Sequence, residues 1–300
     1  MLSQSQRFTA LGLSSLLIWA SLVGVVKLIS EQLSPVLALA LIYSVGALVI
    51  LLHQGWPKLS QMPKIYLWGG GALFVSYEIL FLLSIALSTQ REQVLMIAMI
   101  NYLWPPLSIV LAILAKQLRY HWAVIPGFVL AVLGLMLVVN PEIWNLVQLW
   151  SVLTENPLAY SLAFSAALLW PCYGVLTRAY AQGSNAVSLF FVVTAALLWA
   201  LHVGLDEPWQ WPGLPLWGWI VLAGALIGMA YHNWNQSIQF GRIQLLILAT
   251  YFIPVLSSLI SMWLLQLQPG WVFWLGCSLV SLGALICWKS TSEKIGRAHV

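Results

Sequence analysis

Two residues are candidates for chemistry because they are polar and lie inside long apolar stretches. Glu78 lies in the middle of the apolar run 65–87, and His232 lies within the polar sequence Tyr-His-Asn-Trp-Asn-Gln at 231–236. An acid at such depth in a membrane span is costly and is a functional candidate by default. Glu78 could bind a substrate ammonium group, carry a proton, or be a protonated structural acid bonded to a neighbouring helix. His232 could face a water-filled cavity or join a tight network between helices, and a histidine there could also titrate near neutral pH.

Aromatic residues at mid-depth of the apolar runs form the second candidate group. Two pairs of them occupy positions that an internal repeat relates, Trp19 with Trp170 and Tyr102 with Tyr251. A cavity with aromatic walls and few charges suits a ligand with a flat apolar part and a small polar end, or an organic cation. The residues expected to converge at mid-depth are Trp19, Tyr77, Tyr102, Trp104, Trp170, Tyr173, Tyr231, Trp234 and Tyr251.

The composition indicates that membrane-spanning helices position these residues. Hydrophobic residues make up 61% of the 300 residues and charged residues only 7%, whereas soluble domains carry about 25% charged residues. A helix needs roughly 20 apolar residues to cross a bilayer. We therefore predict an all-α integral membrane protein with ten transmembrane helices, at 8–29, 34–52, 65–87, 92–115, 121–139, 157–180, 185–205, 215–239, 243–265 and 270–289.

Charged residues sort the loops into two sets. Ten of the 12 Lys and Arg residues fall in the termini or in alternate loops, and six of the 8 acidic residues fall in the other loops. Cation-rich loops stay in the cytoplasm, so both termini are predicted to be cytoplasmic. Two cations lie on the outer side. Lys27 is expected to extend from its helix end to the interface, and Arg91 to pair locally with Glu92.

The second half of the chain repeats the first with the charges removed. At a constant offset of 149, eleven of the 33 residues from 102 to 134 are identical in the second half. The connecting loop contains Lys116, Arg119 and His121 in the first copy, and Gln266, Gln268 and Gly270 in the second. The two copies are therefore predicted to lie upside down relative to each other, which is typical of alternating-access transporters.

The repeat also predicts how the chain is divided. Each half holds five helices, and an odd number places the start of the second half on the opposite face, in agreement with the charges. Two near-equivalent packings of such halves are the mechanical basis of a two-state transporter. The expected parts are a first five-helix repeat at 1–139, a periplasmic linker at 140–156, a second, inverted repeat at 157–289, and a cytoplasmic tail at 290–300.

Prolines and glycines recur at equivalent positions of the two halves. Pro105 and Pro254 fall near the middle of equivalent helices, where a proline removes a hydrogen bond and kinks the helix. Glycines seven residues apart, at 127 and 134 and again at 276 and 283, mark a face on which helices can approach closely. Such a face can also serve as a contact between subunits.

Together these features resemble the drug/metabolite transporter superfamily over residues 8–289. The resemblance rests on a tryptophan eight residues before a cation (Trp19–Lys27 and Trp170–Arg178), on the segment Tyr-x-x-Pro-x-Leu-Ser at 102–108 and 251–257, and on the glycine-bounded segments 127–134 and 276–283. Within the superfamily, the tryptophan-rich helices and Asn-Tyr-Leu-Trp-Pro-Pro at 101–106 look like the aromatic amino acid exporters of bacterial inner membranes.

The resemblance implies a function. A chain of that kind would export phenylalanine, tyrosine and tryptophan, and other neutral amino acids, across the bacterial inner membrane. No cofactor, metal or nucleic acid is implied, and the partners are the small-molecule substrate and the lipid bilayer. The central cavity would be lined by Trp19, Tyr77, Glu78, Tyr102, Trp104, Trp170, Tyr231, His232 and Tyr251.

Other functions are weighed against this one. An exporter of cationic or amphipathic drugs, coupled to protons, would use Glu78 as its mid-membrane acid. An enzyme is not expected, because the sequence has no zinc-protease, nucleophile-elbow or phosphate-loop motif. A membrane scaffold would not need polar residues at mid-depth. The sequence leaves open whether transport is proton-coupled or facilitated, and whether the protein is a monomer or a homodimer.

Overall fold

The computed structural model of the chain describes residues 3–116, 120–139 and 146–292. Helices and their connections make up these residues, with no strand among them. Eight of the helical stretches are long and apolar enough to cross a membrane, and two shorter apolar helices accompany them. The predicted all-helical membrane class is therefore confirmed, whereas two of the ten expected spans are short in the described part of the chain.

The first half contains six α-helices and two short helical turns. Their bounds agree with the predicted apolar runs to within a few residues. They are α1 (Gln4–Ser30), α2 (Pro35–Gln54), the 3-10 turn η1 (Leu59–Gln61), the π-helical turn η2 (Ile65–Gly70), α3 (Gly71–Ala86), α4 (Arg91–Asn101), α5 (Trp104–Leu114) and α6 (Val124–Val139).

The second half contains seven α-helices. The first of these, α7, lies within the predicted linker 140–156, whose residues 140–145 are outside the described residues. Of the predicted tail 290–300, residues 293–300 are likewise outside them. The helices are α7 (Leu146–Glu155), α8 (Pro157–Tyr180), α9 (Val187–Gly204), α10 (Leu214–Phe240), α11 (Ile243–Thr250), α12 (Ile253–Leu265) and α13 (Trp271–Ser292).

Local sequence explains where several helices begin. Ser3 caps α1 through a capping box, accepting from the Gln6 amide while the Gln6 side chain accepts from the Ser3 amide. Asn156 caps α8 by accepting from the Ala159 amide at 3.2 Å. A proline occupies the first turn of α2, α5, α8, α10 and α12. Its missing N–H has no helical partner in a first turn, so proline is tolerated there.

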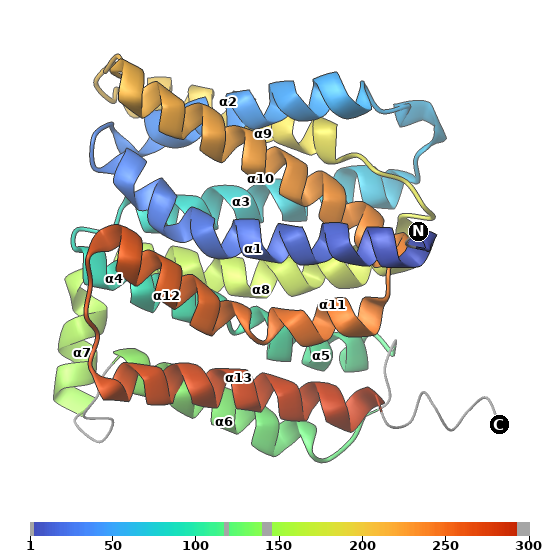
Figure 1. Cartoon of the computed structure of the whole chain (residues 1–300), viewed down its shortest axis with the longest axis vertical. Coiled ribbons are helices and arrows are strands. Elements are labelled where there is room, and N and C mark those ends of the chain that lie inside the picture. The colour runs from blue at the N-terminus through green and yellow to red at the C-terminus, as the bar shows by residue number, and fades with distance from the viewer. Residues whose placement is uncertain (1–2, 117–119, 140–145, 293–300) are drawn as a thin grey trace.

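The long helices lie side by side in a bundle. In Figure 1, α2, α9 and α10 lie at one end of the longest axis, α6 and α13 at the other, and α1, α3 and α8 between them. The start of α1 and the end of α13 lie on the same side of the bundle. The α1–α2 turn and α7 lie on the opposite side.

The glycines of α6 and α13 bring these two helices into backbone contact within the chain. A Cβ atom at Gly283 would lie 2.4 Å from the Gly127 oxygen, and one at Gly276 would lie 2.6 Å from the Gly134 oxygen. A side chain at either position would therefore overlap the partner backbone. The close-approach face is used inside one chain, and these glycines are not available as a subunit contact.

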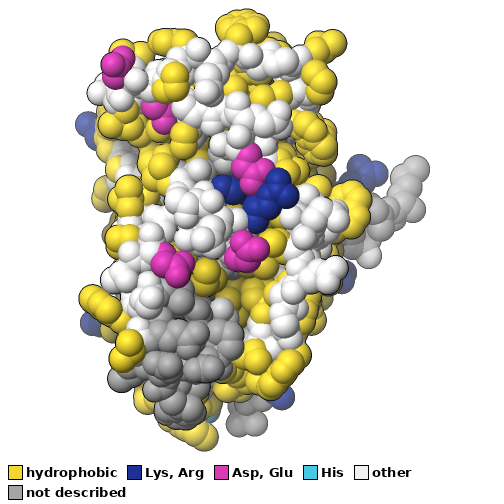
Figure 2. All heavy atoms as spheres, turned by 90° about the vertical axis from the view of Figure 1, so that its left-hand side faces the viewer, with side chains coloured by type: hydrophobic (Ala, Val, Ile, Leu, Met, Phe, Trp, Pro, Cys, Tyr) yellow, Lys and Arg dark blue, Asp and Glu magenta, His cyan; other side chains and the backbone are white. Residues whose placement is uncertain are grey.

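Polar contacts join several helices on the face opposite the chain ends. Figure 2 shows this face, where acidic side chains surround a small group of cationic ones. Arg91 pairs with Glu31 of the α1–α2 turn, at 2.6 and 2.8 Å, and not with Glu92 as expected. This hydrogen bond with Arg91 lowers the pKa of Glu31 below its usual value. Lys27 does not extend into the surroundings of the protein, because its side chain is buried and donates to the Ser88 carbonyl at 2.5 Å.

Candidate functional site

Two helices break at mid-depth, at positions that the repeat relates. α4 ends at Asn101 and α5 begins at Trp104, and α11 ends at Thr250 and α12 begins at Ile253. An offset of 149 superimposes the two breaks, including the backbone bonds Leu103 N–H to Ile100 and Phe252 N–H to Ala249. Pro105 and Pro254 therefore lie in the first turn of a second helical segment and not in the interior of a continuous helix.

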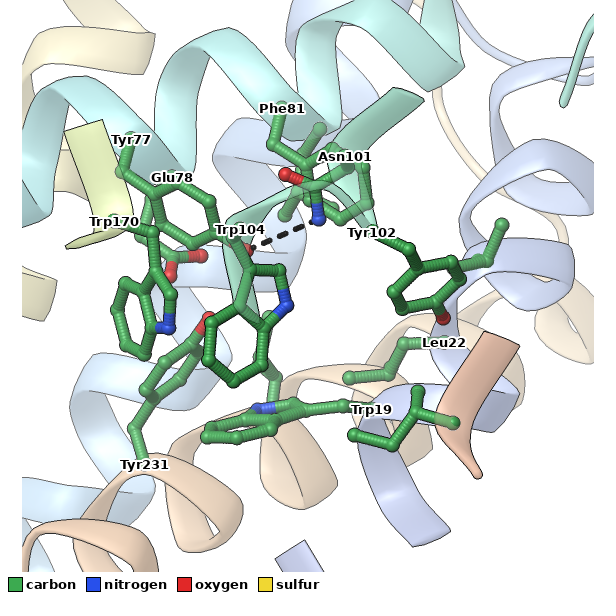
Figure 3. A pocket seen from close by; sticks show the side chains of 14 residues that line it. Trp19, Leu22, Tyr77, Glu78, Phe81, Asn101, Tyr102, Trp104, Trp170 and Tyr231 are labelled. Atoms are coloured by element: carbon green, nitrogen blue, oxygen red, sulfur yellow. Dashed lines mark hydrogen bonds between the residues drawn. The ribbon is translucent and has the colours of Figure 1, made fainter. Parts of the chain in front are cut away.

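A cavity of about 50 Å³ lies beside the first of these breaks. That space holds a few water molecules, so an aromatic ring enters it only if the wall residues move. Figure 3 shows Trp104 between Trp19 on one side and Asn101 on the other. The wall consists of Trp19, Leu22, Val23, Tyr77, Glu78, Phe81, Leu82, Asn101, Tyr102, Trp104, Trp170, Ile227, Tyr231 and Ile253.

Both halves of the chain contribute equivalent residues to this wall. Trp19 and Trp170 are equivalent, and their rings meet edge to face with centroids 6.1 Å apart. Trp104 and Ile253 are equivalent through the offset of 149, and both line the cavity. Binding sites of inverted-repeat transporters lie near the midplane where the repeats meet. The cavity lies where residues of the two halves of the chain meet.

A layer of aromatic rings separates the cavity from the side on which α3 begins. Phe74 is at its centre, with centroid distances of 5.1 Å to Tyr231, 5.5 Å to Tyr173 and 5.5 Å to Phe190. Tyr66 continues the layer, 5.8 Å from Phe190. Aromatic pairs at such distances stabilise packing beyond their buried area. All of these rings are buried, so passage to that side requires these helices to separate.

Glu78 is the one charged residue on the cavity wall. Its side chain is 1% exposed, and its Oε2 atom accepts a hydrogen bond from the Tyr43 hydroxyl of α2. Figure 3 shows the Tyr231 hydroxyl on the same side of the cavity as the carboxyl group of Glu78. No lysine, arginine or histidine is among the described wall residues. The carboxyl group therefore meets polar neighbours but no protein cation across the cavity.

The sequence-based site residues separate into two groups. Seven of the nine lie on the cavity wall, namely Trp19, Tyr77, Glu78, Tyr102, Trp104, Trp170 and Tyr231. His232 does not, because the next residue along α10 points about 100° away from Tyr231. Its ring bonds Gln54 at 2.8 Å and Gln236 at 3.0 Å. Tyr251 also lies away from the wall, buried with its ring 6.3 Å from that of Trp288.

Asn101 is the polar wall residue that the sequence reasoning missed. Its side chain is buried, and its Nδ2 atom donates to the Tyr77 hydroxyl at 3.5 Å (Figure 3). An uncharged amide inside an apolar run was a usable signal, because polar groups in spans face a partner or a cavity. Among the described residues, no group of three or more His, Cys, Asp or Glu side chains could hold a metal ion.

Comparisons with known proteins agree with this architecture. Residues 157–288 match the EamA-like transporter family. The chain is 35% identical to the aromatic amino acid exporter YddG of Salmonella typhimurium (strain 14028s / SGSC 2262), over 97% of this chain and 99% of that protein. It is also 35% identical to the exporter of the same name from Escherichia coli (strain K12), over 95% of this chain and 98% of that protein.

Two more distant proteins match this chain over nearly the whole of both lengths. The aromatic amino acid exporter YddG of Ancylobacter novellus is 25% identical over 93% of this chain and 96% of its own. A crystal structure of a protein 24% identical to this chain has the same fold, with a TM-score of 0.68 over 95% of this chain and 96% of that one. The matches to transporters confirm the prediction of a transporter and not an enzyme. The chain belongs to the EamA-like transporter family of the drug/metabolite transporter superfamily.

Proposed function

We propose that this protein exports aromatic amino acids, and other neutral amino acids, across the bacterial inner membrane. The observation that carries the proposal is the 35% identity to an aromatic amino acid exporter over nearly the whole of both chains. The aromatic wall of the cavity supports it, because flat apolar side chains pack well against Trp and Tyr rings. The proposed binding residues are the seven predicted residues of the wall, with Asn101 added.

Alternating access is the proposed mechanism. Helix packing supports it, because contacts made by one half have counterparts made by the other. α1 packs against α10 and α12, and their equivalents follow the same pattern, with α8 packed against α3 and α5. α2 packs against its own equivalent α9, and α6 against α13. This is the pattern expected of two inverted five-helix repeats, whose two packings would open the cavity to either side in turn.

Uptake into proteoliposomes tests the proposal. Labelled phenylalanine is supplied outside vesicles that hold the purified protein, with and without an imposed pH gradient. Saturable uptake that Trp170→Ala or Tyr102→Ala abolishes is the expected result. An effect of the gradient would indicate proton coupling, and its absence would indicate facilitated diffusion. Absence of uptake for every neutral amino acid under both conditions would refute the proposal.

A second candidate substrate class is cationic drugs, and Glu78 is the observation that favours it. A buried carboxyl group on a cavity without protein cations attracts organic cations, which the surrounding rings also bind. The Glu78→Gln variant separates the two candidates. Loss of uptake for an organic cation, with phenylalanine uptake unchanged, would favour drug export.

A further inference from the structure

Three buried polar atoms on the cavity wall lack a hydrogen-bond partner among the residues that the structure describes. They are Oε1 of Glu78, Oδ1 of Asn101 and Nε1 of Trp19. Native proteins keep few unpaired buried polar atoms, because each one loses its bonds to water without a replacement. These three come from α3, α4 and α1 and share one cavity. Because all three belong to residues of one cavity wall, a bound polar ligand would supply the hydrogen bonds that these atoms lack.

The chemical types of the three atoms restrict that ligand. The carboxyl oxygen of Glu78 and the amide oxygen of Asn101 accept hydrogen bonds, whereas the indole N–H of Trp19 only donates. An ammonium group offers three N–H donors and no acceptor, and so fits the two oxygens. A carboxylate accepts only, and so fits the indole N–H. An α-amino acid carries both groups on one carbon atom.

The surroundings of Glu78 favour an ammonium group as its partner. The Tyr43 hydroxyl bonds Oε2 from the side of α2, whereas Oε1 has no partner among the described residues. A buried carboxylate is stable only when a cation or several donors balance it. Lys27 and Arg91 are both used elsewhere, on Ser88 and on Glu31. No lysine, arginine or histidine lies on the described wall, so a cation that balances Glu78 would come from the ligand.

Aromatic neighbours fix the indole of Trp19. Its ring lies 4.8 Å from Tyr231, 5.1 Å from Trp234 and 6.1 Å from Trp170. Three contacts of this kind hold the ring in one orientation, so its N–H is a directed donor. Figure 3 shows Trp19 across the cavity from Asn101. The donor residue Trp19 and the acceptor residue Asn101 thus lie on opposite sides of the space.

We propose that Glu78 and Asn101 bind the α-ammonium group of the substrate, while Trp19 donates to its α-carboxylate. This inference rests on the proposed function, and it assigns what the cavity recognises beyond the aromatic side chain. The aromatic rings select for the side chain, and the three polar atoms select for the zwitterion. A phenyl compound that lacks either charged group leaves one buried atom of the wall unpaired and binds weakly.

Competition in proteoliposomes tests the proposal with defined probes. Uptake of labelled phenylalanine is inhibited with 3-phenylpropionate, which lacks the ammonium group, and with phenethylamine, which lacks the carboxylate. In the wild type, each analogue should inhibit at least about 10-fold less well than unlabelled phenylalanine, since a bond to a charged group is lost. Thermal stabilisation of the detergent-solubilised protein by the same compounds gives a second measure of binding.

Two variants assign the two ends of the substrate. Glu78→Gln should raise the KM for phenylalanine about 10-fold to 100-fold and leave inhibition by 3-phenylpropionate unchanged. Trp19→Phe keeps an aromatic ring without the N–H, and should remove the preference for phenylalanine over phenethylamine. Trp219→Phe is the matched control, because Trp219 is 41% exposed on α10 and away from the cavity wall. Its kinetics should equal those of the wild type.

Several outcomes would overturn the assignment. If Glu78→Gln takes up phenylalanine with unchanged KM and still discriminates against 3-phenylpropionate, Glu78 does not bind the ammonium group. If that variant loses only its response to an imposed pH gradient, Glu78 carries a proton instead. Both results leave the proposed function intact. Absence of uptake of every neutral amino acid by the wild type, with and without a pH gradient, would refute the proposed function, and this inference with it.

Discussion

Glu207 shows how one side chain can replace a missing helix cap. It lies in the loop between α9 and α10, and its carboxylate accepts from the amides of Val36 and Leu37 at 3.3 and 3.2 Å. These amides belong to the first turn of α2, whose own cap residue Ser34 makes no side-chain hydrogen bond to the helix. A negative charge at a helix N-terminus is favourable. Glu207 therefore ties the two halves together on the face opposite the chain ends.

We expect Glu207→Gln to lower the free energy of unfolding by about 1 kcal/mol at pH 7. Burial raises the pKa of Glu207, but bonds from His202, Ser34, Val36 and Leu37 lower it more, and the net shift is downward. A carboxyl group with a lowered pKa stabilises the fold above its ordinary pKa and loses that effect as the pH falls through its lowered value.

The difference between wild type and Glu207→Gln should therefore shrink as the pH is lowered below the usual glutamate range. Thermal unfolding of the detergent-solubilised proteins at several pH values measures it. Glu155→Gln, an exposed residue at the end of α7, serves as the control and should match the wild type throughout. A pH-independent difference would mean that the charge of Glu207 is not what stabilises α2.

Side-chain types identified most of the candidate site from sequence, but not the direction in which each one points. Trp19, Glu78 and Trp104 stood out as large or charged residues at mid-depth, and all three line the cavity. His232 stood out in the same way, yet its ring bonds Gln54 and Gln236 instead. Successive side chains on a helix point about 100° apart. Helix boundaries read from hydropathy are not precise enough to say which of two neighbouring side chains faces a cavity.

Among the helices, α6 and α13 make the closest contact, and glycine is what allows it. At Gly283 a Cβ would meet not only the Gly127 oxygen but also the Ala131 nitrogen, at 2.5 Å. Both obstacles are backbone atoms, which cannot move aside as a side chain can. At Gly218 in α10, by contrast, nothing lies within 4 Å of an added Cβ.

Gly283→Ala should therefore destabilise the protein by about 1–3 kcal/mol through overpacking. Gly218→Ala should stabilise it by about 0.5–1 kcal/mol, because alanine loses less backbone freedom in a helix than glycine does. Thermal unfolding monitored by size-exclusion chromatography compares the two variants with the wild type. Equal melting temperatures for Gly283→Ala and the wild type would show that α6 and α13 can separate at little cost.

Among the helices, hydropathy predicted the long ones well but missed the short helix α7. Hydropathy marks a span because about 20 apolar residues are needed to cross the bilayer. α7 is only 10 residues long, and it lies where a linker was expected. Its apolar residues at 146, 149, 150 and 153 have the spacing of an amphipathic helix, a usable signal that the search for long spans does not detect.

In the whole molecule, the cavity is closed off from the two sides of the bundle by different kinds of contact. The aromatic layer around Phe74 closes the side where α3 begins, over several rings. On the opposite side, Arg91 of α4 bridges Glu31 of the α1–α2 turn and the Leu265 carbonyl at the end of α12, the latter at 3.2 Å. This bridge is partly exposed, so it contributes at most about 1 kcal/mol to stability.

Removing the bridge should favour opening on that side without unfolding the protein. For Glu31→Gln we expect a melting temperature close to that of the wild type and faster labelling of a cysteine placed at Phe81, on the cavity wall, by a reagent added from the α7 side. High salt should have a similar effect on the wild type, because it screens exposed ion pairs. Unchanged labelling in both experiments would show that the bridge does not restrain this end.

The predicted orientation in the membrane can be tested directly. With Cys172, Cys277 and Cys287 replaced by serine, single cysteines are introduced at Ser60, between α2 and η2, and at Glu155, at the end of α7. If cation-rich loops are cytoplasmic, an impermeant maleimide added to intact spheroplasts should label the cysteine at 155 and not the one at 60. The opposite pattern would place both termini outside.

The backbone contact between α6 and α13 has a practical consequence for imaging this transporter. A membrane protein of 33.3 kDa offers little mass outside the detergent micelle for aligning particles in electron cryo-microscopy. Neither helix of this pair contributes a described residue to the cavity wall. A rigid fusion partner that continues the helix of α13 would therefore act as a fiducial marker on a part of the molecule remote from the substrate. Such a chimera could be imaged during turnover.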